Sequence, residues 1–415
     1  MAYRFRYISS FCVLTLLLAA FFFNIKFSFL NFSSFYVGIV AIIFLGILGQ
    51  IRCGKLSSEL MAVVAPLYIA VILAIISYLA NFPEADYFLC GAFFILATLG
   101  LCSFGFFSLF SEMGGQPLLG AVITALSLNA ILMLVMFISP GIQNSYLGIL
   151  TEDGFALLGG VENALESMHR FRMIGATGFA TYSAGFTQTI GLFFLAVYYH
   201  VTKKKPDLLF LMVSVLLAVS AVLAARSSFV GIFFWTIFCF IFFRWRFVFI
   251  FSCSFIFLVI IMVALIALIG AEGADFFTNW LLELFTSGSN SDSLAETIQM
   301  LDTPFMDSGF YGFSRWFGDL GYDYFRSADV GYIRLILAGG FGSLFFVILH
   351  FLLLGLVFFR GRFSAFFRTL YFFLMAYFFV IMLKGAILFD FFAFDFLMLM
   401  LGWIGNQSKD LAKIE

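Results

Sequence analysis

The sequence predicts an all-α polytopic membrane protein with about twelve transmembrane helices. Of its 415 residues, 63% are hydrophobic and 11% are charged, whereas roughly half of a soluble domain is apolar. The mean hydropathy is +1.10. The apolar residues gather in stretches of about 20, the length of helix that crosses a hydrocarbon core. These observations exclude a soluble globular domain and predict one integral membrane domain over residues 1–415.

Twelve apolar stretches follow one another along the chain. The first comes after Arg4 and Arg6 and lacks a cleavage site of small residues, which favours a first span over a signal peptide. The second is short, and Lys384, Asp390 and Asp395 interrupt the last hairpin. We expect spans near residues 8–23, 34–49, 60–80, 87–110, 117–139, 178–199, 208–225, 227–243, 247–269, 331–359, 366–383 and 390–405.

The basic residues orient these spans in the membrane. Lys and Arg are retained in cytoplasmic loops, and most of the 22 basic residues fall on one side of the predicted spans while most of the 23 acidic residues fall on the other. Both termini are therefore predicted to be cytoplasmic. The basic residues on that side are Arg4, Arg6, Arg52, Lys55, Lys203, Lys204, Lys205, Arg244, Arg246, Arg360, Arg362, Arg368, Lys409 and Lys413.

Two exported segments are long, residues 140–177 and 270–330. Long loops in compact domains are usually functional. Apolar residues recur at helical spacing around Trp280 and around Leu165, and Ser293 with Glu296 has the spacing of a capping box. We expect short amphipathic helices in both periplasmic loops.

The composition also excludes several functions. The six cysteines lie in apolar spans or a cytoplasmic loop without a CxxC pair, which predicts neither disulfides nor a cysteine metal site. The chain has no HExxH, no acidic cluster with metal-ligand spacing and no Walker loop, so we expect no metal, no cofactor and no ATP-driven transport. No basic run exceeds Lys203 to Lys205, and a nucleic-acid partner is therefore not expected.

Eight basic residues cross to the exported side against the retention bias. Arg226 lies in a small-Arg-Ser-Ser sequence where two apolar spans meet with almost no loop. It could extend to a lipid phosphate at the surface. Alternatively, its planar fork of donors suits a bound diphosphate.

Arg170 and Arg172 stand just before the sixth span. Arg170 has Glu166 four residues earlier, an ordinary pair on a helix surface. Arg172 has no such partner and is the better candidate for binding an anion. The adjacent His169 could act as a base, although a lone exposed histidine usually does not.

The densest group of polar and aromatic residues covers residues 304–342. Aromatic rings beside carboxylates suit a sugar, but tyrosine and tryptophan also form belts at membrane interfaces. The group contains Asp307, Tyr311, Arg315, Trp316, Asp319, Tyr322, Asp323, Tyr324, Arg326, Asp329, Tyr332 and Arg334.

The end of this group leads into the tenth span. Asp329 could cap that helix, whereas Arg334, one turn inside it, is not explained by a cap. Farther on, Ala338 and Gly342 have the small-xxx-small spacing that lets another helix approach closely.

Two stretches resemble the bacterial O-antigen polymerase family and the related O-antigen ligases. One is the turn Ala225-Arg226-Ser227-Ser228. The other is Gly312-Phe313 followed by Ala328-Asp329-Val330-Gly331-Tyr332 and Gly339-Gly340-Phe341-Gly342. The number of spans and the two exported loops fit the same GT-C-like architecture.

The resemblance implies a glycosyltransferase in the bacterial inner membrane, active at the periplasmic face. Donor and acceptor would be oligosaccharides linked to undecaprenyl diphosphate, and a co-polymerase would regulate chain length. Arginines would stabilise the diphosphate leaving group, and a base would accept the hydroxyl proton. The candidates are Arg226, Arg172, Arg334, Arg315 and Arg170 for diphosphate, Asp329, Asp323 and His169 for catalysis, and Tyr332, Tyr324 and Trp316 for sugar.

The sequence departs from the family pattern in two places. The first departure favours polymerase over ligase, and the second limits the transfer of individual arginine roles. Residues 270–330 contain no histidine, whereas ligases carry one there. Some polymerases carry arginine-rich repeats in both long loops, with a glycine at a fixed spacing. Here Thr181 and Ser183, and not glycine, stand eleven residues beyond Arg170 and Arg172. A lipid-linked oligosaccharide flippase is the main alternative from another class, but its short loops and charged central cavity fit this sequence less well. An anion transporter fits less well still.

Overall fold

The computed structural model describes residues 2–30, 32–53, 58–110, 115–150, 175–177, 181–244, 305–318, 324–359 and 364–412. In these ranges the regular structure is helical, and β-structure is limited to three isolated bridges. Helices lie at eleven of the twelve predicted spans, and the range 247–269 lies outside the described residues. By length and composition, five of the described helices could each cross a membrane. The predicted all-α fold class is confirmed, and the number of spans stays a prediction.

The chain forms two compact units, Met1–Gly38 with Gly115–Ser291 (unit 1) and Ile39–Gly114 with Asp292–Glu415 (unit 2). The grouping of the whole chain into one membrane domain stays a prediction. The predicted amphipathic helices around Leu165, Trp280 and Ser293 lie outside the described residues.

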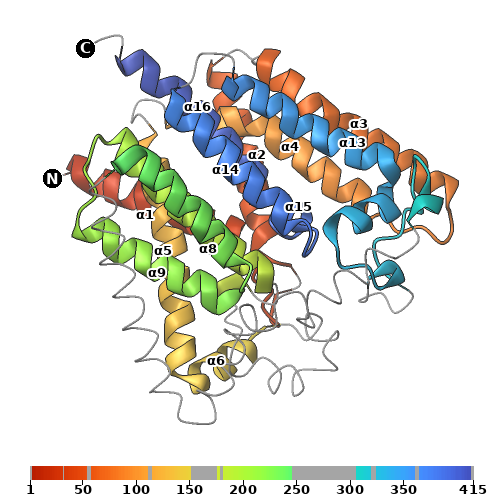
Figure 1. Cartoon of the computed structure of the whole chain (residues 1–415), viewed down its shortest axis with the longest axis horizontal. Helices are drawn as coiled ribbons and strands as arrows, with labels where there is room; N and C mark the ends of the chain where they lie inside the picture. The colour runs from red at the N-terminus through yellow and green to blue at the C-terminus, as the bar shows by residue number, and fades with distance from the viewer. Residues whose placement is uncertain are drawn as a thin grey trace. The chain divides into compact units, whose positions relative to one another are not determined.

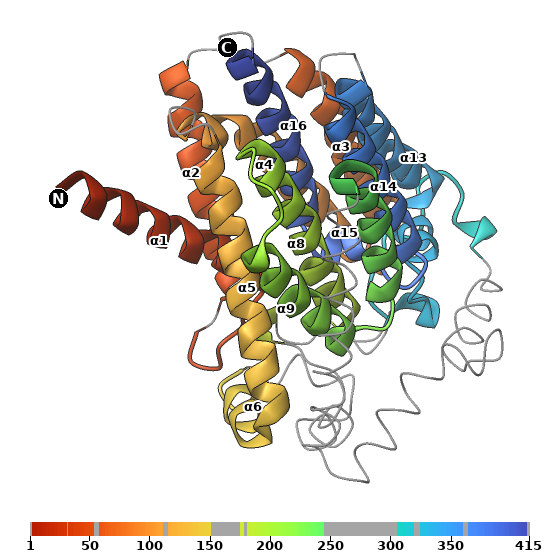
Figure 2. The same cartoon turned by 60° about the vertical axis from the view of Figure 1, so that its left-hand side comes forward.

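In unit 1, α5 is the central helix and packs on α1, α8 and α9 (Figure 1). Figure 2 shows α6 at the end of α5, after the extended residue Ser139. Asp207 caps α9, since its carboxylate accepts a hydrogen bond from the Phe210 N–H at 2.9 Å. The helices are α1 (Ala2–Phe22), α5 (Gln116–Ile138), α6 (Pro140–Leu147), η3 (Gly175–Thr177), α8 (Thr181–Val201), α9 (Leu208–Ala224) and Ser228–Arg244.

In unit 2, α13 packs on α3, and α4 packs on both α3 and α16 (Figure 1). Glycines let α2 approach α4, because a Cβ on Gly49 would lie 1.9 Å from the Gly105 carbonyl oxygen. The elements are α2 (Ser34–Cys53, which begins in unit 1), α3 (Ser58–Ala80), α4 (Phe88–Ser108), η5 (Met306–Ser308), η6 (Phe325–Ser327), α13 (Gly331–Phe359), α14 (Ala365–Ile381), α15 (Ile387–Asp390) and α16 (Ala393–Ala412).

Helix α13 is interrupted at Gly340, whose φ of 68° and ψ of −179° are open only to glycine. In a continuous helix the carbonyls of Leu337 and Ala338 would bond to the N–H groups four residues later. Instead they accept hydrogen bonds from Phe313 and Ser314, both at 2.8 Å. The break therefore opens the helix to a loop from the preceding segment.

The same loop also accepts hydrogen bonds from the backbone N–H groups that follow the break. The N–H groups of Phe341 and Gly342 donate to the carbonyls of Gly309 and Phe310 at 3.1 and 3.0 Å. The segment that packs closely against Ala338 and Gly342 is thus an extended loop. The prediction of an approaching helix is wrong at this point. The non-helical backbone is tolerated because all four groups find hydrogen-bond partners in the protein.

Candidate functional site

The described candidate residues fall in both units. Arg315, Trp316, Tyr324, Asp329, Tyr332 and Arg334 belong to unit 2, and Arg226 belongs to unit 1. His169, Arg170, Arg172 and Asp323 lie outside the described residues, and their roles stay predictions. Unit 2 therefore contains the candidate site that can be built from contacts.

The loop at the α13 break also binds the turn between α3 and α4. The Asp86 carboxylate accepts hydrogen bonds from the backbone N–H groups of Trp316 at 2.6 Å and Phe317 at 3.1 Å. The Asp86 N–H donates to the Ser314 carbonyl at 2.8 Å, and the Asn81 side-chain amide donates to the Gly312 carbonyl at 3.3 Å. Both segments are predicted to be exported, so these contacts agree with the predicted orientation.

Asp86 is a positioning residue that the sequence analysis missed. A single carboxylate before an apolar span looks like a helix cap, and its second oxygen does accept from the Phe88 N–H at 3.1 Å. Its bonds to Trp316 and Phe317 join residues about 230 positions apart. A single sequence carries no local signal for such a pairing.

We expect Asp86→Ala to lower the free energy of unfolding by about 2 to 3 kcal/mol, because hydrogen bonds to a charged group are lost. Thermal unfolding of the purified protein in detergent measures the change. Glu84→Ala is the matched control, since Glu84 is an exposed carboxylate in the same turn. Equal unfolding midpoints for the two variants would contradict the positioning role.

The loop places Trp316 in an aromatic cluster. Its ring is 2% exposed, stacks on Phe88 with centroids 4.9 Å apart and contacts the edge of Phe389 at 5.0 Å. Phe389 belongs to α15, so the ring ties the loop to α4 and α15. This burial gives Trp316 a packing role, and its predicted contact with sugar stays a prediction.

Arg334 lies against this cluster. Its guanidinium carbon is 4.1 Å from the centroid of Trp316 and 3.6 Å from that of Tyr324. A desolvated cation over aromatic faces gains about 2 kcal/mol for each ring. Arg334 itself is 3% exposed. The rings therefore hold a positive charge in the protein interior and fix the plane of the guanidinium.

Two donors of this guanidinium have no protein partner. Nε and Nη1 of Arg334 are buried and make no hydrogen bond to the described residues, and the same is true of Oδ1 of Asp329. A buried charged group without full hydrogen bonding is costly. Such an arrangement is typical of a binding site, because a bound anion would satisfy both N–H groups.

Three charged residues act on Asp329: Arg334 in α13, and Lys384 and Asp390 between α14 and α16. The pKa of Asp329 is raised to about 6, mainly by burial; Arg334 and Lys384 oppose the rise, and Asp390 adds to it. Burial also raises the pKa of Tyr324, and Arg334 opposes that shift. With a pKa of about 6, the Asp329 carboxylate is mostly ionised at neutral pH and can accept a proton.

No family model, curated protein or solved structure matches the chain. The chemistry of the site must therefore be argued from its own residues. Within the described ranges no group of three or more His, Cys, Asp or Glu side chains is placed to hold a metal ion. Among the described residues, Arg334 and Lys384 are the cations whose charges act on Asp329.

The remaining candidates lie around this centre or in unit 1. The Arg315 guanidinium lies 4.7 Å from the centroid of Phe325. The Tyr332 hydroxyl donates to the Phe379 carbonyl at 2.8 Å and joins α13 to α14. Arg226 follows the end of α9, in a turn fixed by the bond from the Ser228 hydroxyl to the Ala221 carbonyl at 2.8 Å.

Taken together, the residues near the start of α13 combine a fixed cation with free donors and a carboxylate of raised pKa. The cation can stabilise negative charge that develops on a leaving group. The carboxylate can accept a proton from an attacking hydroxyl. This pairing fits a group transfer from a phosphate ester or diphosphate to an alcohol.

Proposed function

We propose that this chain is a polysaccharide polymerase of the O-antigen type. It would join oligosaccharides carried on undecaprenyl diphosphate at the periplasmic face of the bacterial inner membrane. The observation that carries this proposal is Arg334, a guanidinium that is 3% exposed and has two nitrogen donors, Nε and Nη1, without a partner among the described residues. The resemblance at Gly312-Phe313 and Gly339 to Gly342 supports it, because these two stretches meet at the α13 break.

In the proposed reaction, a sugar hydroxyl of one lipid-linked repeat attacks the anomeric carbon of the growing chain. Its proton passes to the Asp329 carboxylate. The bond between the anomeric carbon and the diphosphate oxygen breaks, and undecaprenyl diphosphate leaves with the electron pair. Arg334 stabilises the charge that develops on the leaving oxygens. Arg226, Arg172 and Arg315 stay predicted contributors to diphosphate binding.

Deletion of the gene in a strain that makes O-antigen tests the activity. A polymerase leaves lipid A core with a single repeat and removes the ladder of longer chains on a lipopolysaccharide gel. Loss of the single-repeat band as well would overturn the proposal, because a ligase or a flippase is needed for the first repeat too. The predicted co-polymerase partner would still set chain length in the complemented strain.

The pH dependence of the reaction tests Asp329 as the base. Because its pKa is raised to about 6, we expect the polymerisation rate to fall below about pH 6 as the carboxylate becomes protonated. This fall in rate is the acid limb of the pH profile. Lys384→Met removes a charge that lowers this pKa, so the acid limb moves to higher pH. Asp390→Asn removes a charge that raises it, so the limb moves to lower pH.

The measurement is the rate of chain growth by the purified protein in proteoliposomes supplied with lipid-linked repeats. The two variants serve as controls for each other, because a nonspecific loss of folding would not move the limb in opposite directions. An acid limb at the same pH in both variants would show that Asp329 is not the base.

A further inference from the structure

A second buried polar group lies in unit 2, far from Arg334. Nε2 of His350 in α13 is 2.8 Å from Oδ1 of Asp395 in α16, and Nδ1 is 2.8 Å from the Val63 carbonyl oxygen in α3. The side chains are 1% and 3% exposed. His350 lies 16 residues after Arg334 in α13, on the other side of the break at Gly340. This group is therefore separate from the candidate site.

The hydrogen bonds fix where the protons lie. A carbonyl oxygen only accepts, so Nδ1 of His350 carries a hydrogen. A second proton lies between Nε2 and Oδ1 of Asp395, and the pair as a whole is neutral. The other carboxylate oxygen, Oδ2, is buried and has no hydrogen-bond partner in the part of the chain that the structure describes. Because an unsatisfied buried acceptor is costly, Oδ2 is the place where a further proton would bind.

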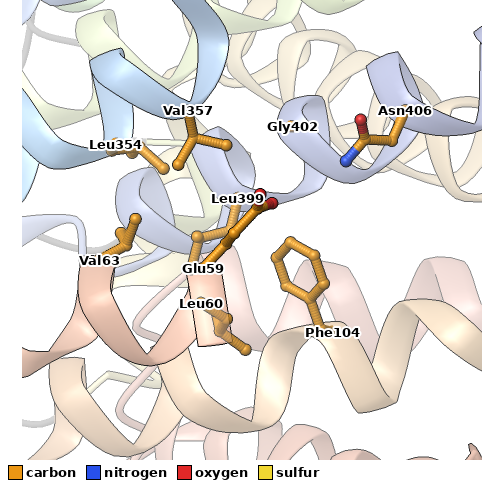
Figure 3. Close-up of a pocket in the computed structure, with 9 residues that line it drawn as sticks. All are labelled: Glu59, Leu60, Val63, Phe104, Leu354, Val357, Leu399, Gly402 and Asn406. Atoms are coloured by element: carbon orange, nitrogen blue, oxygen red, sulfur yellow. The ribbon is translucent and has the colours of Figure 1, made fainter. Parts of the chain in front are cut away.

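A small cavity begins one helical turn from this pair, and Figure 3 shows the residues that line it. Its volume is about 60 Å³, far below the roughly 300 Å³ of a small-molecule site, but sufficient for water. Val63 lines it, as do Leu354 and Leu399, each one helical turn beyond His350 or Asp395. Figure 3 shows the Glu59 carboxylate in the middle of the lining residues, which are Glu59, Leu60, Val63, Phe104, Leu354, Val357, Leu399, Gly402 and Asn406.

The other elements around the pair add few ionisable groups. From α14, the Tyr371 hydroxyl is committed to the Phe351 carbonyl. From α4, Gly100 faces the pair, and a Cβ there would lie 3.7 Å from Oδ2 of Asp395. From α3, Glu59 is the acidic group in the cavity. The cavity therefore extends from residues one helical turn away from the pair to Glu59, near the predicted cytoplasmic side.

We propose that His350 and Asp395 form a proton-binding site and that the cavity around Glu59 is its route to the cytoplasm. One proton from water passes by way of Glu59 to Oδ2 of Asp395, and the charge of the pair changes from zero to +1. The same step in reverse returns the proton. Ionisable residues inside membrane helices usually serve such functions. This site does not depend on the proposed glycosyl transfer.

Infrared difference spectroscopy of the full chain in lipid nanodiscs tests the site. Spectra are compared between about pH 8 and pH 5, the range of histidine-linked proton switches, in an Asp329→Asn background because that carboxyl titrates in the same range. We expect a band of a protonated buried carboxyl at low pH that is absent in Asp395→Asn. A spectrum without this band would overturn the proposal.

His350→Gln gives an independent readout. We expect the pH dependence of the carboxyl band to differ from that of the unsubstituted chain, because the imidazole that shares a proton with Asp395 is lost. If either variant fails to fold, labelled histidine in the unsubstituted chain provides the test, because the chain has only three histidines. A His350 signal that is unchanged over the same pH range would also overturn the proposal.

The route is tested by the rate of proton uptake after a rapid pH change. We expect Glu59→Gln and the cavity-filling Gly402→Val to slow the carboxyl band by at least about tenfold, equal to 1.4 kcal/mol in the barrier. Gly91→Ala is the control, because a Cβ there meets no atom within 4 Å. Unchanged rates in both cavity variants would show that protons reach Asp395 by another path.

Discussion

Replacing Arg334 by glutamine is expected to lower the rate of polymerisation by about 100- to 1,000-fold, because one preorganised charge facing the leaving group is lost. Glutamine keeps a side chain of similar reach and can still donate a hydrogen bond. It cannot hold the positive charge that lies over Trp316 and Tyr324. The lipopolysaccharide ladder and the rate in proteoliposomes both measure the effect.

Two further variants separate charge from geometry. Arg334→Lys retains the charge but loses the planar fork, so we expect intermediate activity. Arg326→Gln is the matched control, because the Arg326 guanidinium also lies on an aromatic ring, 4.7 Å from Phe313, but is exposed. A full ladder in Arg334→Gln, with the protein present at the normal level, would refute the diphosphate role.

Gly340→Ala is expected to have the largest effect on stability. The backbone there has a φ of 68° and a ψ of −179°, which costs a residue with a Cβ about 1 to 3 kcal/mol. In addition, the Cβ would lie 2.2 Å from the Phe310 carbonyl oxygen. The loop would have to leave the break, and its bonds to Leu337 and Ala338 would be lost. We therefore expect a loss of several kcal/mol in the free energy of unfolding.

Thermal unfolding in detergent and limited proteolysis of residues 305–318 measure this effect. Gly91→Ala, in the open position on α4, should unfold at about the same temperature as the unsubstituted protein, since alanine favours a helix. If Gly340→Ala matched this control, the break in α13 would not exist in the folded protein.

Hydropathy predicted the helices well because each apolar stretch has the length and composition of a helix. The range 331–359 coincides with α13, Gly331–Phe359. The interruption within it could not be predicted. Gly339, Gly340 and Gly342 indicate a close approach, but the same small residues would accept either a helix or a loop. Only the hydrogen bonds to Gly309, Phe310, Phe313 and Ser314 show that a loop, and not a helix, lies there.

The candidate site could be predicted in part. The retention bias of basic residues predicts Arg334, and the resemblance to the polymerase family implies Asp329 as a base. Trp316 was selected as an aromatic near these charges, and its burial against Phe88 depends on folding at long range. Lys384 is one of the eight basic residues predicted to cross to the exported side, and Asp390 interrupts the hydropathy of the last hairpin. Their effect on Asp329 comes from proximity, which one sequence does not encode locally.

The partners of the loop at the α13 break have a consequence for the order of biosynthesis. Asn81 and Asp86 precede Gly312 and Trp316 by about 230 residues. At 5 to 20 residues per second, the turn between α3 and α4 leaves the ribosome roughly 10 to 50 s before its loop partner. The inserted hairpin must therefore wait in the membrane with the Asp86 carboxylate open to water. The catalytic centre that we propose can be assembled only after most of the chain has been translated.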